Sequence, residues 1–150
     1  MLKLYSYFRS SAAFRVRIAL ALKGLDWQAV PVNLLNKEHK DDAYTAVNPQ
    51  GLVPVLHVEQ QNINQSMAII EYLDERYPEV MLLPADALQR AQVRALAYQM
   101  VMDIHPLNNL RVLNYLQRHL ACDDTSKQAW YGHWIDVGFS AFEQSLSMGQ

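Results

Sequence analysis

The spacing of hydrophobic and polar residues changes between the first two segments of the chain. Residues 2–7, LKLYSY, alternate and are rich in strand-forming types, which predicts a β-strand. The run from Ser10 or Ser11 to Lys23 instead places apolar side chains four residues apart, which is the spacing of a helix. Gly24 follows this run, as is usual just past a helix end. We expect a strand followed by a helix.

A second strand is predicted for residues 27–34, WQAVPVNL. Pro31 has no backbone N–H to donate within a sheet, so this strand should lie at a sheet edge. Because a helix separates the two strands, the connection is a crossover and the strands should pair in parallel.

The next forty residues begin with a polar stretch, residues 36–44, which we expect to be weakly ordered. A buried strand then follows Val53–Pro54, and the short segment 61–64 reads as its partner. Ser66 is expected to cap a helix that ends near Tyr77. The order is therefore β-α-β, a polar middle and β-β-α.

Only helical patterns follow the proline-containing connector of residues 78–86. Residues 86–118 have one long helical pattern with Pro106 inside it, which predicts a kink or break near Asp103–Pro106. Thr125 or Ser126 is expected to cap a further helix, and Asp123–Asp124 is read as a turn or cap. We expect an α/β domain over residues 1–80 and an all-helical domain over residues 86–150.

Composition and charge narrow the class of protein. The chain has 150 residues, 51% of them hydrophobic, which is enough for a buried core. Thirteen Lys and Arg against fifteen Asp and Glu give a net charge of −2, and no basic block suggests a nucleic-acid surface. The beginning of the chain has no apolar leader segment, and the apolar runs are too short to cross a bilayer. With a single cysteine, Cys122, we expect a soluble cytoplasmic protein.

Two serine-containing helix starts are the first candidates for chemistry. Ser10 and Ser11 stand where the first helix begins, and Ser66 stands where a later one begins. Serine at such a position can be only a cap. The N-terminus of a helix also favours anions, because its free N–H groups and its dipole attract negative charge. The residues alone leave both interpretations open.

Several motifs together resemble the cytosolic glutathione transferases: NPQGLVPVL, QSMAIIEYLDERYP and LLPAD. SSAAFRVRIALALKG is similar to the zeta-class signature, and DIHPLNNLRVLNYL (residues 103–116) is similar to bacterial maleylpyruvate and maleylacetoacetate isomerases. The resemblance implies a thioredoxin-like domain over residues 1–80, an all-helical second domain over residues 86–150, and a homodimer. Because the family's helical domain continues further, we expect residues 86–150 to be an incomplete domain.

The resemblance also implies a glutathione site. Ser10, with Ser11 as the second candidate, would donate a hydrogen bond to the thiolate of glutathione, and Val53–Pro54 is expected to have a cis peptide bond. A helix N-terminus and a hydroxyl donor both favour a thiolate. The residues implied to bind glutathione are Ser10, Ser11, His39, Val53, Pro54, Gln65, Ser66, His105 and Asn109.

His105 and Asn109 would share a helix face if their helix were unbroken, and His105 would contact the glutathione of its own subunit or of the partner. Arg9 and Arg111 are the predicted ligands of a dicarboxylate substrate, because arginine binds carboxylates in a bidentate manner. Arg15 and Arg17 lie inside the first helix and are assigned structural or interface roles.

One position departs from the zeta signature. Ala12 stands where the family usually has cysteine, so glutathione's own sulfur is the only nucleophile expected at this place. No cluster of His, Cys, Asp and Glu has the spacing of metal ligands, and no metal is expected.

The resemblance implies glutathione-dependent cis–trans isomerisation of maleylacetoacetate or maleylpyruvate, in the catabolism of aromatic compounds. Two alternatives are a general glutathione transferase that conjugates small electrophiles and a non-catalytic interaction module of the same fold. The combination of Ser10, Val53–Pro54 and Gln65–Ser66 argues against the interaction module.

Overall fold

The computed structural model describes residues 1–149, and their contacts divide the chain into two compact units, Met1–Leu82 and a second that begins at Leu83. The first unit contains β1 (Leu2–Ser6), α1 (Ser11–Leu22), β2 (Trp27–Pro31), η1 (Glu38–Lys40), α2 (Asp42–Thr45), β3 (Val55–Val58), β4 (Gln61–Asn64) and α3 (Ser66–Arg76). The second contains α4 (Ala87–Tyr98), the π-helical segment η2 (Gln99–Ile104), α5 (Leu110–His119) and α6 (Asp124–Ser147).

The four strands form one mixed sheet in the order β2-β1-β3-β4. β1 pairs with β2 in parallel, whereas the β1–β3 and β3–β4 pairs are antiparallel. β2, which contains Pro31, is an edge strand. The predictions of an edge position and a parallel first pair are both confirmed.

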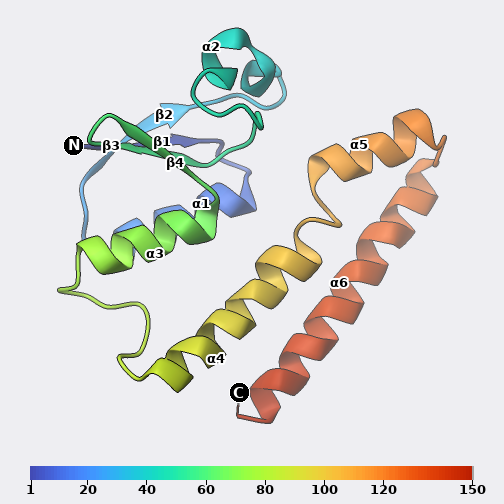
Figure 1. Cartoon of the computed structure of the whole chain (residues 1–150). Helices are drawn as coiled ribbons and strands as arrows, with labels where there is room; N and C mark the ends of the chain where they lie inside the picture. The colour runs from blue at the N-terminus through green and yellow to red at the C-terminus, as the bar shows by residue number, and fades with distance from the viewer. Residues whose placement is uncertain (150) are drawn as a thin grey trace. The chain divides into compact units, whose positions relative to one another are not determined.

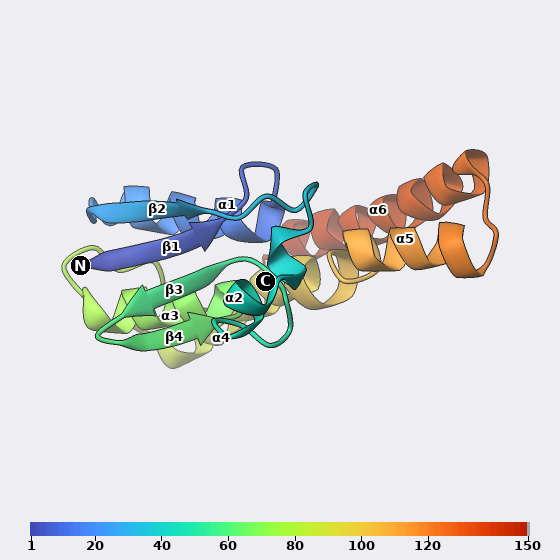
Figure 2. The ribbon, with the colours of Figure 1, turned by 90° about the horizontal axis from the view of Figure 1, so that it is seen from above.

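Helices α1 and α3 cover one face of the sheet, and α2 lies on the other (Figures 1 and 2). Alternation along β1 directs Leu2 and Leu4 toward the covered face, where they are buried. The core of this face consists of Leu2, Leu4, Val16, Leu20, Leu56, Val58, Ile69 and Leu73. This β-α-β then β-β-α arrangement is the predicted thioredoxin-like fold.

The segment between β2 and β3 is better ordered than the sequence suggested. It contains η1 and α2, and Tyr44 and Asn48 are buried. The Tyr44 hydroxyl donates to the Leu52 carbonyl at 2.7 Å, and the Asn48 amide donates to the same oxygen at 2.8 Å. The expectation of a weakly ordered stretch is therefore wrong, because two side chains within it anchor it to the residue before Val53.

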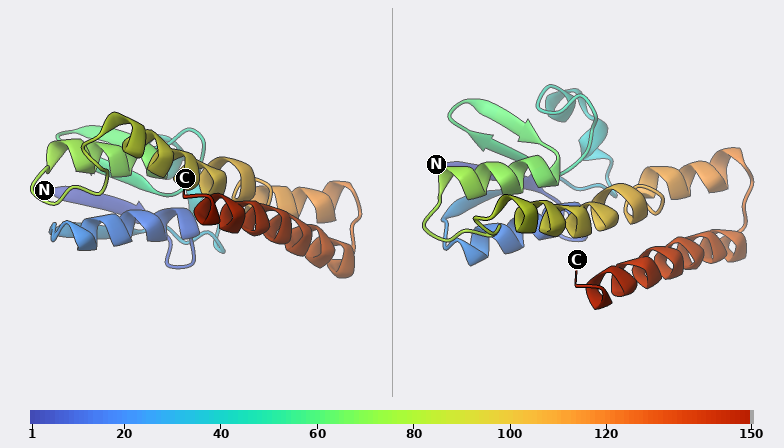
Figure 3. Two further views of the ribbon diagram at one scale, coloured as in Figure 1. Left: turned by 90° about the horizontal axis from the view of Figure 1, so that it is seen from below. Right: turned by 60° about the horizontal axis from the view of Figure 1, so that its bottom comes forward.

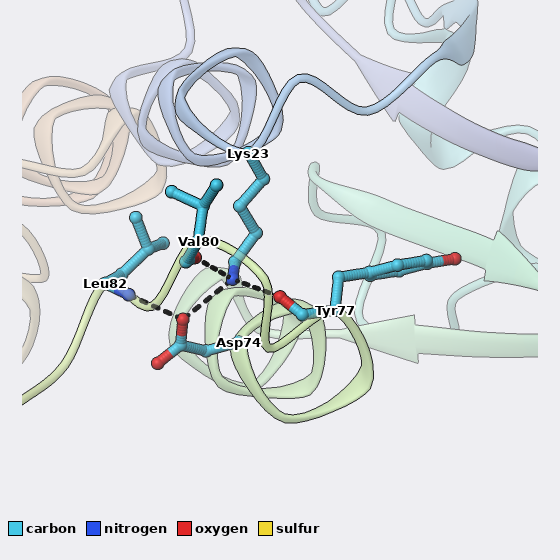
Figure 4. Close-up of polar contacts among 5 residues, drawn as sticks. All are labelled: Lys23, Asp74, Tyr77, Val80 and Leu82. Carbon is cyan, nitrogen blue, oxygen red and sulfur yellow. Dashed lines mark hydrogen bonds and ion pairs between the residues drawn. The ribbon is translucent and has the colours of Figure 1, made fainter. Parts of the chain in front are cut away.

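Helices α1 and α3 of the first unit run in the same direction and contact each other near both ends. At the far end, Lys23 Nζ lies 2.8 Å from Asp74 Oδ1 and donates to the carbonyls of Tyr77 at 2.9 Å and Val80 at 2.6 Å (Figure 4). Asp74 also accepts the backbone N–H of Leu82 at 2.7 Å. This buried group of contacts was not anticipated, and it ties the end of α1 to α3 and to the chain that leaves α3.

The second unit is a set of helices in which α6 runs back along η2 and α5 (Figure 3). Ile104 is buried against Gly138 of α6, where a Cβ atom would collide with its side chain. Trp130 Nε1 also donates to the Leu107 carbonyl at 3.0 Å. α4 continues as η2 and the helical path ends before α5, so the predicted break near Pro106 is confirmed.

The start of α6 confirms the reading of Asp123–Asp124 as a turn or cap and corrects the expectation that Thr125 or Ser126 caps the helix. Its N-cap is Asp123, whose carboxylate accepts the Ser126 N–H at 2.7 Å, so neither Thr125 nor Ser126 is the cap. This contact holds the pKa of Asp123 below its ordinary value. Asp123 is the cap because it directly precedes the helix and its carboxylate reaches the N–H groups of the first turn. Across residues 1–149, no helix combines the length and the apolar character needed to span a membrane.

Candidate active site

Ser10 caps α1 and is the first of the predicted site residues. Its backbone is extended, with φ −78° and ψ 115°, and its Oγ accepts the Ala13 N–H at 3.2 Å. A hydroxyl that accepts one hydrogen bond keeps its own proton for a second partner. Among residues 1–149, no acceptor takes the Ser10 proton. Capping therefore leaves this hydroxyl able to donate to a bound anion.

The loop before Ser10 is held by Arg17, the seventh residue of α1. Its guanidinium donates to Ser6 Oγ at 2.8 Å, to the Tyr7 carbonyl at 3.4 Å and to the Phe8 carbonyl at 3.2 Å. The structural role expected of Arg17 is confirmed. Arg9, the predicted substrate ligand in this loop, is exposed, as is Ser11 at the first position of the helix.

Val53–Pro54 has a cis peptide bond, as predicted. Val53 is half-buried. It lies between Leu52, whose carbonyl accepts from Tyr44 and Asn48, and Pro54, which directly precedes β3. Neither its N–H nor its C=O is hydrogen-bonded to another group of residues 1–149. Both groups can therefore pair with an extended peptide, as an added strand would.

The start of α3 corrects the predicted cap. The N-cap position belongs to Gln65, and Ser66 is already the first residue of the helix. Gln65 has φ +66°, a conformation that non-glycine residues rarely adopt and that is found at binding sites when the surrounding structure enforces it. Its side-chain amide donates to Gln50 Oε1 at 3.1 Å, so no side chain caps the N–H groups of the first turn.

Ser66 is buried and accepts a hydrogen bond from Arg15 of α1, with 3.2 Å between Nη1 and Oγ. As at Ser10, the acceptor role is taken within the protein and no described residue accepts the hydroxyl proton. Burial lowers the pKa of the Arg15 guanidinium from its ordinary value. Arg15 brings a positive charge to the same helix end that carries the positive pole of the α3 dipole.

His39 lies in η1, beside the segment that leads to Val53. At Gly51, φ is +60° and a Cβ atom would come within 2.7 Å of the His39 carbonyl oxygen, so the absence of a side chain allows this approach. His39 Nδ1 is buried with no hydrogen-bond partner among the described residues. Burial, and then the neighbouring Lys40, lower the pKa of His39, while Asp41 opposes this change.

The three predicted residues of the helical unit are placed differently from the expectation. His105 follows η2, whereas Asn109 is the N-cap of α5, and its side chain accepts the Arg111 N–H at 3.0 Å. His105 and Asn109 were expected to share a helix face only if their helix were unbroken. The helical path is interrupted between them, so that condition is not met. Arg111 is exposed on the first turn of α5. Their roles as ligands stay predictions.

Two residues that contact the predicted site residues were not named as candidates from the sequence. Arg15 was assigned a structural or interface role, and Gln50 was not singled out, although it stands in the NPQG motif just before Val53. The motif was a signal for Gln50. Nothing in the linear pattern connects Arg15 with Ser66, which lies 51 residues away.

The candidate groups at Ser10, Ser66 and Arg15 therefore lie at one end of the sheet. The N-termini of α1 and α3 lie at the same end, at the carboxyl ends of β1 and β2 (Figures 1 and 2). In sheets with parallel strands, this is where ligands bind. No group of three or more His, Cys, Asp or Glu side chains within residues 1–149 is arranged to hold a metal ion.

Comparison with known proteins defines the class. Residues 9–76 match the model of the glutathione S-transferase N-terminal domain. Maleylacetoacetate isomerase of Pseudomonas aeruginosa is 52% identical over 97% of this chain and 69% of its own length. Maleylpyruvate isomerase of a Ralstonia species is 48% identical over 98% of this chain and 69% of its own length.

Solved structures agree with the relatives. A zeta-class bacterial maleylpyruvate isomerase in its holo form is 49% identical, with a TM-score of 0.92 over 95% of this chain and 67% of its own. A maleylacetoacetate isomerase of Methylobacterium extorquens with bound malonate and glutathione is 36% identical, with a TM-score of 0.94 over 97% of this chain and 68% of its own. The chain belongs to the glutathione S-transferase family, in its zeta class.

Proposed function

We propose that this protein catalyses the glutathione-dependent cis–trans isomerisation of a maleyl dicarboxylate, either maleylacetoacetate or maleylpyruvate. The observation that carries the proposal is the state of Ser10: its oxygen accepts the Ala13 N–H, and its proton has no acceptor within residues 1–149. A hydroxyl donor at the positive end of a helix favours an anion such as a thiolate. Relatives at 52% and 48% identity bear the two isomerase names.

The other groups at this end of the sheet fit an extended peptide with a charged end. The backbone N–H and C=O of Val53 are available for pairing. Ser66 and Gln65 stand at the uncapped N-terminus of α3, which suits the γ-glutamyl carboxylate of glutathione. His39 is proposed to reach the glycyl carboxylate, and His105 and Asn109 stay predicted ligands from the helical unit.

In the mechanism, bound glutathione supplies a thiolate that adds reversibly to the cis double bond, so that the substrate can rotate about the resulting single bond. Ser10 donates its hydroxyl proton as a hydrogen bond and so holds the sulfur in its anionic form, with Ser11 as the second candidate. Val53 orients the peptide, which limits the approach of the sulfur to one direction. Ala12 contributes no competing thiol at the start of α1.

Arg9 and Arg111 are the proposed ligands of the two substrate carboxylates, since both are exposed arginines. Arg111→Ala is expected to raise KM for the dicarboxylate by roughly tenfold or more, because a hydrogen bond to a charged group is lost, and to leave KM for glutathione near its original value. Steady-state kinetics with each substrate varied in turn measures both. Equal effects on the two KM values would remove Arg111 from the substrate site.

The stoichiometry of glutathione tests the reaction itself. An isomerase returns glutathione unchanged, whereas a transferase consumes one molecule for each product. Maleylacetone, a small analogue, should therefore lose its cis form while the thiol concentration stays constant. Loss of thiol at the same rate as the cis form would identify a conjugating transferase instead, and failure of the protein to be retained on immobilised glutathione would favour a non-catalytic module.

Three finer features complete the proposal. A maleyl dicarboxylate suits a place in the catabolism of aromatic compounds. The cytoplasm is the proposed location, because reduced glutathione is maintained there. A homodimer is proposed from the family, and exposed apolar side chains on α4 and α6, such as Leu88 and Phe139, are of the kind that a second copy buries. Light scattering coupled to chromatography would measure the mass.

A further inference from the structure

Arg15 is a partly buried cation with an incomplete set of partners. Its guanidinium has five N–H donors, and one of its nitrogens donates to Ser66 Oγ at 3.2 Å. No carboxylate of residues 1–149 pairs with it. Burial already opposes its charge, as the lowered pKa of the guanidinium indicates. Because desolvated charges are ordinarily paired, this cation lacks the anion that its surroundings require.

The N-terminus of α3 adds a second source of positive potential beside Arg15. Ser66 is the first residue of an eleven-residue helix, so the free N–H groups of α3 point toward the same space. A guanidinium and the positive end of a helix dipole disfavour each other in the absence of a negative charge. A carboxylate bound there would interact favourably with both, and would also accept hydrogen bonds from the uncapped N–H groups.

Ser66 links the two features, because its oxygen accepts from Arg15 and its proton must therefore point elsewhere. Ser66 is only 6% exposed, and no described residue accepts its hydroxyl proton. In this arrangement Arg15 determines the direction in which the Ser66 hydroxyl donates.

We propose that Arg15 is a positioning residue for the γ-glutamyl carboxylate of glutathione: it orients the Ser66 hydroxyl toward that carboxylate and supplies the opposite charge. The inference rests on the proposed binding of glutathione and adds to it a residue on α1, the helix that also carries the thiolate donor Ser10. One helix then serves both ends of the γ-glutamyl-cysteinyl unit. A purely structural role, in which Arg15 only joins α1 to α3, is the competing explanation.

A pair of ligands separates the two explanations. One is glutathione, and the other is 4-aminobutanoyl-cysteinyl-glycine, which is glutathione without the α-carboxylate of its first residue. Isothermal titration calorimetry gives Kd for both with the unmodified protein, Arg15→Met and Arg15→Lys. Arg76→Met is the matched control, because Arg76 is an exposed arginine at the opposite end of α3.

In the unmodified protein we expect the analogue to bind roughly ten- to a hundredfold more weakly than glutathione, as for loss of a charge-assisted hydrogen bond. Arg15→Met should weaken glutathione binding by a similar factor and leave the Kd of the analogue unchanged, so that the two ligands bind almost equally. Arg15→Lys, which keeps the charge without the planar fork, should recover part of the preference. Arg76→Met should retain all of it.

Two results would overturn the inference while glutathione binding stands. Arg15→Met could retain the full preference for glutathione, or it could weaken both ligands equally, as a structural tie would. If Arg15→Met fails to fold in a thermal melt, Arg15→Lys decides, and an unchanged preference in that variant refutes the role. If the unmodified protein binds neither ligand, the proposed function fails before Arg15 is tested.

Discussion

Two cations of α1 and its C-cap, the buried Lys23 and the half-buried Arg15, differ in what surrounds them. The side chain of Lys23, at the end of the helix, is 1% exposed, and its three donors are occupied by Asp74 and by two backbone carbonyls (Figure 4). Arg15, near the beginning, has one hydroxyl partner and no carboxylate among the described residues. The two positions are eight residues apart on one helix, and each contacts α3.

The difference separates a structural contact from a site prepared for a ligand. A buried charge is tolerated when the protein itself supplies the opposite charge and satisfies every donor, as it does at Lys23. At the other end the protein leaves several donors without acceptors: the Ser10 hydroxyl, the Ser66 hydroxyl and most of the Arg15 guanidinium. The charge and donors at the Lys23 end of α1 and α3 are satisfied within the protein. The donors at the Arg15 end would be satisfied by an anionic partner.

The largest expected effect is on stability, at the Lys23 end of α1. Lys23→Met leaves the Asp74 carboxylate buried without its cation, which should lower the free energy of unfolding by about 3–5 kcal/mol. Glutathione should bind the folded variant with an unchanged Kd, because Lys23 is remote from Ser10 and Ser66. Chemical denaturation and calorimetry measure the two quantities.

A double variant distinguishes loss of the charge pair from loss of packing. Lys23→Met combined with Asp74→Asn removes both charges, and the asparagine oxygen can still accept the Leu82 N–H. The double variant should recover about half of the lost stability, since an unpaired buried charge is the main cost. If the double variant is less stable than the single one, the contact is not governed by charge.

At the beginning of α1, Ser10→Ala should lower kcat by about 10²–10³-fold, as for other donors to a reacting anion. The lost cap should reduce stability by only about 0.5–2 kcal/mol. Turnover assays and a thermal melt on the same preparation compare the two. A variant with a collapsed melting temperature and normal turnover in its folded fraction would assign Ser10 to capping alone.

Gly51→Ala tests the approach of the His39 segment to Gly51, which lies two residues before Val53. An added Cβ would lie 2.7 Å from the His39 carbonyl oxygen, and φ is +60°, so we expect a loss of about 1–3 kcal/mol together with weaker glutathione binding. Gly24→Ala is the matched control, because its φ is +64° and nothing lies within 4 Å of the added atom. Equal effects of both changes on Kd would show that the close approach does not matter.

The smallest expected effect is a change in the titration of His39. Burial lowers the pKa of the free side chain, and a nearby glycyl carboxylate would favour the imidazolium and raise the pKa. Binding should therefore tighten as the pH falls through the interval between the free and the bound pKa values, and should not depend on His39 above both. Titration by NMR with S-methylglutathione, which has no ionisable thiol, measures the shift. An unchanged pKa would separate His39 from the carboxylate.

Much of the first unit could be predicted from local pattern. The strand of residues 2–6 follows from alternation, the helix after Ser10 from its cap and its spacing, and the edge position of β2 from Pro31. These features depend on residues close together in the chain. The break near Pro106 was predictable for the same reason, because proline lacks the N–H that a helix needs.

The errors have different causes. Ser66 was expected as a cap where Gln65 holds the N-cap position, and Thr125 or Ser126 was named as a cap beside Asp123, which holds it. Neighbouring polar residues compete for one helix start. The segment around Tyr44 was expected to be weakly ordered, since its composition is polar and its anchor at Leu52 lies outside the polar stretch. Composition does not reveal such contacts.

The sequence by itself determined the order of strands and helices, the family resemblance and the serine at the start of the first helix, since each depends on short-range pattern. Only the tertiary structure decided that Arg15 meets Ser66 and that Lys23 meets Asp74, contacts that span 51 positions each. The physical reason is that pairing of charges depends on distance in space. Helices that pack side by side bring together residues whose separation along the chain has no periodic signature.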